Sequence, residues 1–202
     1  MGNLPDFRLW IFRHRGVIPV AFILSILFFN FFTDATSPDD SVLEMLGVAV
    51  IGGGLALRAW AVGYAGRHTR SYKLRSPRLV TSGPYAFVRN PIYLGNLLIG
   101  LGIVFMAQKW IVFGVFLVGF WAEYGAIVSL EEEFLSNAFG ERYDEYRRRV
   151  PRWLPRLTPA QTSAPDSFSW RALRKEYLAV LSALVMAGAV ELGEHLRSLI
   201  LR

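Results

Sequence analysis

The sequence predicts an all-α, polytopic membrane protein with about four to five transmembrane helices. Of its 202 residues, 53% are hydrophobic, which exceeds the apolar share of ordinary soluble domains. Several apolar runs have the length of membrane helices, and short groups of basic residues flank them. No strand followed by a Gly-x-Gly pattern is recognisable.

Composition also excludes several kinds of function. The net charge of +6 lies in short groups beside apolar runs, which indicates membrane flanks, and no nucleic-acid partner is expected. The absence of cysteine excludes disulfides, thiol catalysis and thiolate metal sites. His14, His68 and His195 lie far apart and lack metal-binding spacing, so no metal site is expected.

The first two apolar runs are Val17 to Phe32 and Val42 to about Ala65, separated by a polar loop. We interpret the first run as a retained span, although its length also suits a signal peptide. Gly52 to Gly54 in the second run predict close approach of another helix. Arg58 either extends to an interface or faces a polar interior.

A basic connector then leads to a helical hairpin. The runs Ile92 to Met106 and Ile111 to Val128 are joined by only four residues, which predicts antiparallel neighbours. The Lys/Arg bias places the amino terminus, the connector and residues 131–156 on one side, which we expect to be cytoplasmic.

The carboxyl-terminal part has a different composition. Residues 157–169 are rich in Pro, Ser, Thr and Ala and predict a flexible linker between a core at 1–156 and a helix within 170–202. The apolar stretch Tyr177 to Val190 is short for a span, so a tilted transmembrane helix and an interfacial amphipathic helix both remain open.

Polar residues concentrate just before the third run, in GPYAFVRNPIYLG (residues 83–95). Pro84 and Pro91 break any helix, so the backbone between them is expected to have unpaired amides and carbonyls. Arg89 could hold a carboxylate through two hydrogen bonds, or it could be an ordinary interfacial arginine. Tyr85 and Tyr93 could equally be aromatic residues of the membrane interface.

A second polar segment, residues 131–155, follows the fourth run. Glu131 and Glu132 point about 100° apart on a helix, so they can serve different partners, or they could form a solvated helix beginning. Tyr143 and Tyr146 share one helix face. Because the hairpin returns both polar segments to one membrane face, a site can assemble there.

Together, the two segments resemble isoprenylcysteine carboxyl methyltransferases and the related phospholipid methyltransferases. GPYAFVRNPIYLG is followed, after a hairpin, by EE-x-x-L-x-x-x-FG-x-x-Y-x-x-Y-x-x-x-VP, and the resemblance extends over roughly residues 45–156. Order, spacing and membrane setting agree. The matching residues are Gly83, Pro84, Tyr85, Arg89, Pro91, Tyr93 and Gly95 in the first motif, and Glu131, Glu132, Phe139, Gly140, Tyr143 and Tyr146 in the second.

This resemblance implies a small helical core, without a Rossmann domain, that binds S-adenosylmethionine at its cytoplasmic face and admits a lipid or lipidated substrate from the bilayer. The missing Gly-x-Gly pattern is consistent with that. It implies catalytic roles for Arg89, Glu131 and Glu132. It also implies cofactor contacts from the following residues: Gly83, Pro84, Tyr85, Arg89, Asn90, Tyr93, Gly95, Glu132, Tyr143 and Tyr146. The family usually has histidine where this chain has Asn90, and asparagine cannot act as a titrating acid or base.

The cofactor carries a carboxylate, an ammonium and a sulfonium. Arg89 suits the carboxylate, Glu131 or Glu132 suits the ammonium or ribose, and Tyr93, Tyr143 or Tyr146 suits the sulfonium. The acceptor could be an isoprenylcysteine-type carboxylate or a phospholipid amine. Alternatives are an NADPH-dependent membrane reductase and a non-catalytic protein that docks partners or anionic lipid.

Overall fold

The computed structural model describes residues 7–14, 24, 25, 28, 41–66, 78–160, 167–174 and 176–200. Within these ranges every regular element is a helix, which confirms the all-α class. The elements are α1 (Phe7–His14), α3 (Ser41–Ala65), the 3-10 turn η2 (Gly83–Ala86), α4 (Pro91–Ala107), α5 (Trp110–Phe139), α6 (Glu141–Arg149), α7 (Trp170–Leu173) and α8 (Tyr177–Ile200). Most of the expected first span, Val17 to Phe32, lies outside the described residues.

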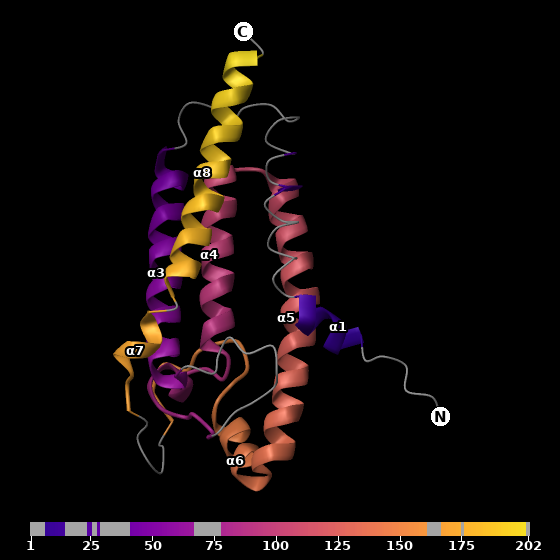
Figure 1. Cartoon of the computed structure of the whole chain (residues 1–202), viewed down its shortest axis with the longest axis vertical. Coiled ribbons are helices and arrows are strands. Elements are labelled where there is room, and N and C mark those ends of the chain that lie inside the picture. The colour runs from indigo at the N-terminus through magenta and orange to yellow at the C-terminus, as the bar shows by residue number, and fades with distance from the viewer. Residues whose placement is uncertain are drawn as a thin grey trace.

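The long described helices α3, α4, α5 and α8 form a bundle along the long axis of the molecule (Figure 1). Helix α4 packs against α3, α5 and α8, and the short α7 packs against α3. The tight turn at Gln108 and Lys109 joins α4 to α5 at one end, while η2 and α6 lie at the other. The predicted hairpin therefore places both sequence motifs at the same end of the bundle.

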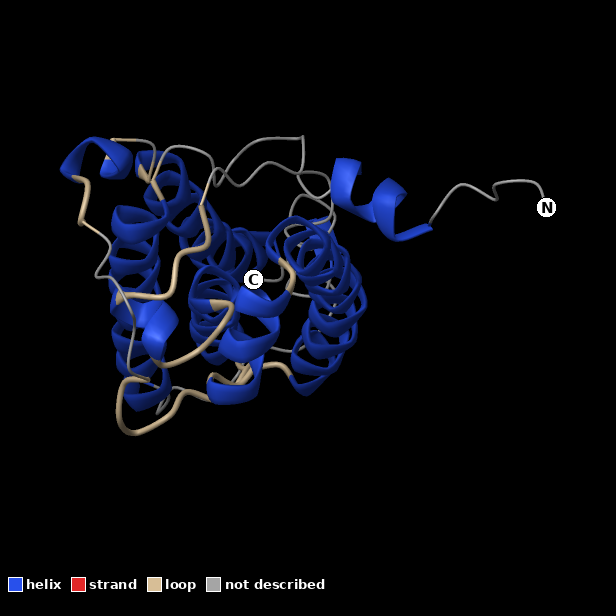
Figure 2. Cartoon of the chain, turned by 90° about the horizontal axis from the view of Figure 1, so that it is seen from below, coloured by secondary structure: helices blue, strands red, loops and turns tan. Residues whose placement is uncertain are grey.

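Seen from below, the loops and short helices near the motifs cover the ends of the long helices (Figure 2). Helix α1 lies at the periphery, beside α5. Ile11 and Phe12 of α1 are buried with Ile127 of α5. This contact covers part of the α5 surface.

Helices α3 and α4 approach closely because glycines face each other along their contact. A Cβ on Gly54 would lie 2.7 Å from the carbonyl oxygen of Gly95, and a Cβ on Gly47 would lie 2.6 Å from that of Gly102. The close approach predicted for residues 52–54 is therefore made by Gly54, whereas Cβ atoms on Gly52 and Gly53 would meet no atom within 4 Å. Small residues at such contacts are typical of membrane helices.

The main apolar core lies between α4, α5 and α8. Ile103 of α4 and Val112 of α5 are almost completely buried, and Ala183, Met186 and Val190 of α8 complete the cluster. Because three residues of α8 belong to it, the carboxyl-terminal helix is part of the bundle.

By length and composition, three described helical stretches are apolar enough to cross a membrane: Val42–Ala65, Trp110–Phe139 and Trp170–Gly193. Helix α4 is also apolar but has only 17 residues. These features support an integral membrane protein, while the total of four to five spans stays a prediction.

Two helices are longer than the sequence predicted. Helix α5 continues through Glu131 to Phe139, so the acidic residues lie inside a helix, and the interpretation as a helix beginning was wrong. Helix α8 continues past Glu191 to Ile200, although its apolar stretch ends at Val190. A helix can continue through charged residues wherever these reach water or an oppositely charged partner, so the length of an apolar run underestimates the length of the helix.

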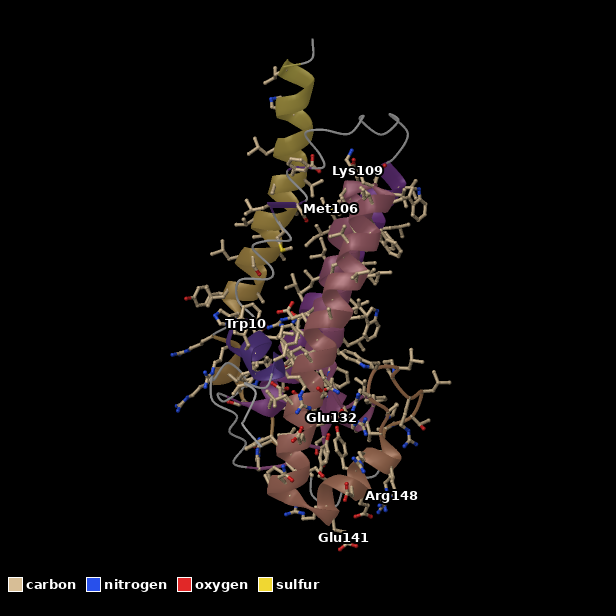
Figure 3. The ribbon with its side chains drawn as sticks, turned by 90° about the vertical axis from the view of Figure 1, so that its right-hand side faces the viewer. Trp10, Met106, Lys109, Glu132, Glu141 and Arg148 are labelled. Carbon is tan, nitrogen blue, oxygen red and sulfur yellow. The ribbon has the colours of Figure 1, made fainter. Side chains whose placement is uncertain are left out.

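Figure 3 shows how charge is distributed along the bundle. Met106 and Lys109 lie near the end with the α4–α5 turn, and Glu132, Glu141 and Arg148 lie toward the opposite end. The second end therefore carries the polar residues that the sequence singled out. That this end faces the cytoplasm stays a prediction.

Candidate functional site

The first motif folds as a tight turn that places Arg89 and Asn90 at the start of α4. Gly83 has a φ of 61°, which strains residues with a side chain, and a Cβ there would lie 2.5 Å from the Tyr64 ring. Pro84 and Pro91 lie in the first turns of η2 and α4, where a missing amide hydrogen is tolerated.

Residues 151–160 pair with this turn through the backbone. Three hydrogen bonds join the segments: from the amide of Arg89 to the carbonyl of Pro151 (2.9 Å), from Arg156 to Phe87 (3.0 Å), and from Ala160 to Ala86 (2.9 Å). The expectation that the prolines leave backbone groups unpaired was wrong for these three positions. The partners come from a segment 62 to 74 residues further along the chain, and sequence periodicity does not reveal such a pairing.

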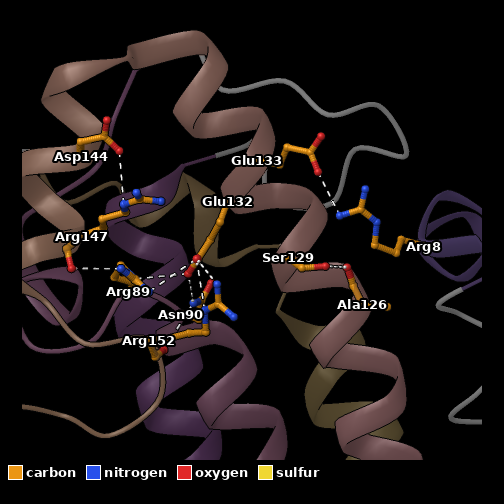
Figure 4. Close-up of polar contacts among 10 residues, drawn as sticks. All are labelled: Arg8, Arg89, Asn90, Ala126, Ser129, Glu132, Glu133, Asp144, Arg147 and Arg152. Carbon is orange, nitrogen blue, oxygen red and sulfur yellow. Dashed lines mark hydrogen bonds and ion pairs between the residues drawn. The ribbon is translucent and has the colours of Figure 1, made fainter. Parts of the chain in front are cut away.

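One buried carboxylate joins the two motifs (Figure 4). Asn90 donates from Nδ2 to Oε1 of Glu132 at 3.2 Å, and Nε of Arg89 lies 3.2 Å from the same oxygen. Arg152 donates to Oε2 from Nη2 at 2.6 Å and from Nε at 3.1 Å. Glu132 is therefore surrounded by two guanidinium groups and an amide.

Arg89 points into this cluster. Its side chain is 12% exposed, and its Nη1 donates to the carbonyl oxygen of Arg147 at 3.1 Å. Its Nε lies close to Oε1 of Glu132 without hydrogen-bond geometry, and its Nη2 donates to Oε2 of Glu132 at 3.5 Å. The alternative of an interfacial arginine extended toward headgroups was wrong, because the guanidinium group contacts Glu132 and Arg147 inside the protein.

The three consecutive acids have three different environments. Tyr93 donates from its hydroxyl to Oε1 of Glu131 at 2.7 Å, whereas Glu133 pairs with Arg8 of α1 at 2.9 Å. Glu132 alone is buried. The separate directions of Glu131 and Glu132 follow from helix geometry, as the sequence predicted.

Tyr143 and Tyr146 lie on the buried face of α6. Their exposed fractions are 1% and 9%, and the Tyr146 hydroxyl donates to the carbonyl oxygen of Tyr85 at 2.8 Å. Burial raises the pKa of Tyr143, with a further contribution from the Glu132 carboxylate. Burial also raises the pKa of Tyr146 and of Tyr85, so all three hydroxyls stay protonated at neutral pH. Contact of Tyr143 or Tyr146 with a sulfonium stays a prediction.

Gly95 has a packing role that sequence reasoning did not assign. A Cβ on this residue would lie 2.5 Å from Cγ of Arg58 and 2.9 Å from the carbonyl oxygen of Gly54. Gly95 therefore gives space to the stem of Arg58 at the contact between α3 and α4.

Sequence reasoning missed Arg152 and Asn96, and for Arg58 it left the inward direction as one of two alternatives. Arg152 lies between Pro151 and Pro155, a pattern like the one that singled out Arg89, and this was an available signal. Asn96 accepts a hydrogen bond from Arg58 and donates to the Tyr124 hydroxyl at 2.9 Å. A polar residue in an apolar helix was the signal here.

Chemically, this end of the bundle combines cations, carboxylates and aromatic rings. Arg89 and Arg152 share one carboxylate, so their combined charge exceeds that of Glu132 and favours an additional anion. Glu131 adds a carboxylate on the Tyr93 side. This donor set fits S-adenosylmethionine, which carries a carboxylate together with positive groups. Among the described residues, no group of three or more His, Cys, Asp or Glu side chains is placed to hold a metal ion.

Fold and site together define a membrane-embedded helical protein with a charged site at one end of its bundle. The chain belongs to the phospholipid methyltransferase family, whose model matches residues 42–142. This confirms the family predicted from the two motifs.

Three relatives illustrate the breadth of the similarity. The chain is 40% identical to the cobalt-zinc-cadmium resistance protein CzcN of Cupriavidus metallidurans, over 72% of this chain and 66% of that protein. It is 29% identical to the nickel-cobalt-cadmium resistance protein NccN of Alcaligenes xylosoxydans xylosoxydans, over 91% and 85%. It is 35% identical to the protein-S-isoprenylcysteine O-methyltransferase B of Arabidopsis thaliana, over 56% and 59%.

The chain thus spans less than two thirds of the length of CzcN and of the Arabidopsis protein. No solved structure matches the chain.

Proposed function

We propose that this protein transfers a methyl group from S-adenosylmethionine to a lipid-borne acceptor at the membrane interface. The observation that carries the proposal is the contact of Glu132 with Arg89, Asn90 and Arg152, because it unites both motifs at one end of an apolar bundle. The family and the isoprenylcysteine methyltransferases among the relatives support the same reaction.

When bound, S-adenosylmethionine supplies an electrophilic methyl group. Arg89 and Arg152 would bind the cofactor's carboxylate, and Glu131 would accept hydrogen bonds from its ammonium or ribose. Asn90 donates to Glu132 and so fixes the carboxylate between the two arginines. A titrating base at position 90 is unnecessary for a carboxylate acceptor, which is already ionised at neutral pH.

For a carboxylate acceptor, catalysis depends on position and on exclusion of water. The carboxylate would attack the methyl group as the bond from the methyl carbon to sulfur breaks, which would leave a neutral ester and a neutral thioether. A water-poor site favours this loss of opposite charges. The apolar bundle beside the motifs supplies such surroundings. For an amine acceptor, a group that removes a proton is also needed.

Cofactor binding is the first test. The purified protein should bind S-adenosylmethionine saturably in detergent, as measured by calorimetry. Arg89→Ala should weaken binding about tenfold or more, because it removes a charge-assisted contact with the cofactor's carboxylate. Glu132→Gln should also weaken binding, because Arg89 and Arg152 lose the carboxylate that positions both of them. Glutamine retains the volume of Glu132 and limits the damage to folding.

Exposed neighbours supply matched controls. Glu133→Gln changes the adjacent acid, whose side chain is 55% exposed, and Arg148→Ala changes an exposed arginine of α6. Both should leave cofactor affinity unchanged. Absence of binding to well-folded protein, or equal effects of the site and control variants, would refute the proposed site.

The reaction itself is tested by incubation with methyl-labelled cofactor and candidate lipids, followed by identification of the labelled product. Preferential binding of NADPH would instead favour a reductase. Lipid docking through surface arginines would weaken strongly with ionic strength, unlike binding at a buried site.

The names of CzcN and NccN support a proposal about physiology: the methylated product contributes to metal resistance. A strain that lacks this protein should grow poorly with cobalt, zinc or cadmium. The unaltered protein should restore growth, whereas the Glu132→Gln variant should not. Equal rescue by both forms would separate resistance from methyl transfer.

A further inference from the structure

A second buried cation lies beside the candidate site. Arg58 belongs to α3, inside a helix apolar enough to span the membrane, and its side chain is only 10% exposed. Its stem passes Gly95 of the first motif, where a Cβ would lie 2.5 Å from Cγ. The roles assigned above to the two motifs do not use this guanidinium group.

The carboxylate that holds Arg58 comes from the far end of the chain. Glu176, between α7 and α8, accepts from Nε at 3.1 Å and from Nη2 at 3.3 Å, with a side chain 9% exposed. Nη1 donates to Oδ1 of Asn96. Two parallel hydrogen bonds to both carboxylate oxygens are the geometry with which arginine recognises any carboxylate.

Hydrogen bonds and ring contacts connect this pair to the second motif. Asn96 donates from Nδ2 to the Tyr124 hydroxyl at 2.9 Å, and the rings of Tyr124 and Tyr93 have centroids 5.0 Å apart. Tyr93 in turn donates to Glu131. A carboxylate at Arg58 therefore lies in the same contact network as the acids of the candidate site.

We propose that Arg58, which Asn96 positions, forms a carboxylate subsite that Glu176 occupies until an acceptor binds. A carboxylate on an apolar chain, entering from the bilayer, replaces Glu176 on Arg58 and releases the segment that carries it. This inference rests on the proposed function, because the entering group is then the methyl acceptor. An amine acceptor would be repelled by Arg58, so the subsite selects a carboxylate.

The position of Arg58 favours the acceptor over the cofactor as the source of the carboxylate. Arg58 lies in a candidate span, whereas Arg89 and Arg152 lie outside the spans, in the turns at the end of the bundle. A group attached to a lipid chain approaches within the bilayer, and a soluble cofactor approaches from water.

Glu176 also has the features of a replaceable group. It lies at the start of α8, where the amides of Ala179 and Val180 donate to its backbone carbonyl, so a released carboxylate stays near a helix amino terminus that favours negative charge. Its segment contacts α3 through a hydrogen bond from the Ser169 amide to the Gly63 carbonyl at 2.8 Å and through the packing of Phe168 on Gly63.

Binding of two matched lipids tests the subsite. The probes are N-acetyl-S-farnesyl-L-cysteine and its carboxamide, which differ only in the charge of the head group. The acid should bind the unaltered protein more tightly than the amide. Glu176→Gln should tighten binding of the acid about tenfold by weakening its internal competitor, and should leave the amide unaffected.

Arg58→Gln should abolish the preference for the acid while the amide still binds. Glu191→Gln is the control, since it makes the same change at an exposed position of α8. Equal binding of acid and amide to the unaltered protein, or no effect of Glu176→Gln on the acid, would overturn the proposal. If Glu176→Gln tightens binding of S-adenosylmethionine and not of the acid, the subsite belongs to the cofactor and the proposal is overturned as well.

Release of the segment has a direct readout that leaves Glu176 in place. The chain contains no cysteine and Tyr177 is 62% exposed, so Tyr177→Cys gives one labelling site for an environment-sensitive fluorophore. The acid should change its fluorescence and the amide should not, and equal responses refute release. A protein that binds S-adenosylmethionine and transfers methyl groups without distinguishing the two lipids would refute this inference alone. A protein that binds no S-adenosylmethionine would refute the proposed function.

Discussion

Two adjacent glycines of α3 are expected to respond oppositely to the same substitution. A Cβ on Gly54 would lie 2.7 Å from the Gly95 carbonyl oxygen and 2.9 Å from the Ile99 amide nitrogen, while a Cβ on Gly53 would meet no atom within 4 Å. Gly54→Ala therefore forces two helix backbones apart. Gly53→Ala adds a methyl group to open surface.

The magnitudes follow from these surroundings. Overpacking at Gly54 costs about 1–3 kcal/mol, because backbone atoms of α4 cannot move aside singly as a flexible side chain can. Replacing glycine by alanine within a helix contributes about 0.5–1 kcal/mol of stability at either position. We expect Gly53→Ala to be neutral or stabilising. Gly54→Ala should be less stable than Gly53→Ala by about 1–3 kcal/mol, which is the cost of overpacking at Gly54.

Thermal unfolding in detergent, followed by the helical circular dichroism signal, measures this difference. A change of 1 kcal/mol shifts the midpoint by about 2–4 °C in a chain of this size, so the two variants should differ by several degrees. Equal midpoints, or a lower midpoint for Gly53→Ala, would refute the close packing of α3 on α4 at Gly54.

Three further predictions concern the turns around the site. Tyr146→Phe removes the donor to the Tyr85 carbonyl, so a buried acceptor loses its partner. The free energy of unfolding, measured by denaturant titration, should fall by about 1–3 kcal/mol. An unchanged free energy of unfolding would indicate that this carbonyl contacts water. The pKa of buried Tyr143 is raised above its ordinary value of 10.0, so its contribution to stability should be complete below pH 10 and lost as pH rises toward the folded-state pKa. The free energy of unfolding, measured from pH 8 to 11, should show this decline. Tyr143→Phe should make the decline smaller, and an equal pH dependence of the two proteins would contradict burial of the hydroxyl. Gly140 ends α5 with φ 53° and ψ −128°, and a Cβ there would meet no atom within 4 Å. Gly140→Ala should therefore lower the free energy of unfolding by about 1–3 kcal/mol through backbone strain alone. A neutral result in the same denaturant titration would contradict this backbone conformation.

Much of the bundle was predictable because lipid restricts a chain to few structures. Long apolar runs with basic flanks predict membrane helices, and four linking residues predict an antiparallel hairpin. From that hairpin it follows that the turn at Arg89 and the acids near Glu132 return to one end of the bundle. Helix ends were less predictable, because α5 and α8 continue through charged residues once these reach polar surroundings.

The identities of the contacting partners were decided by the tertiary structure. Sequence spacing does not indicate that Arg152 shares Glu132 with Arg89, or that residues 151–160 pair with the first motif. These contacts join distant segments that have an irregular backbone, so no sequence period marks them. The inward direction of Arg58 depended on a carboxylate 118 residues away.

By itself, the sequence determined the membrane class, the hairpin and the family, because each depends on local composition, period or motif. Only the tertiary structure decided which charges neutralise one another, because a buried charge requires a partner in space and the chain is free to supply it from any segment.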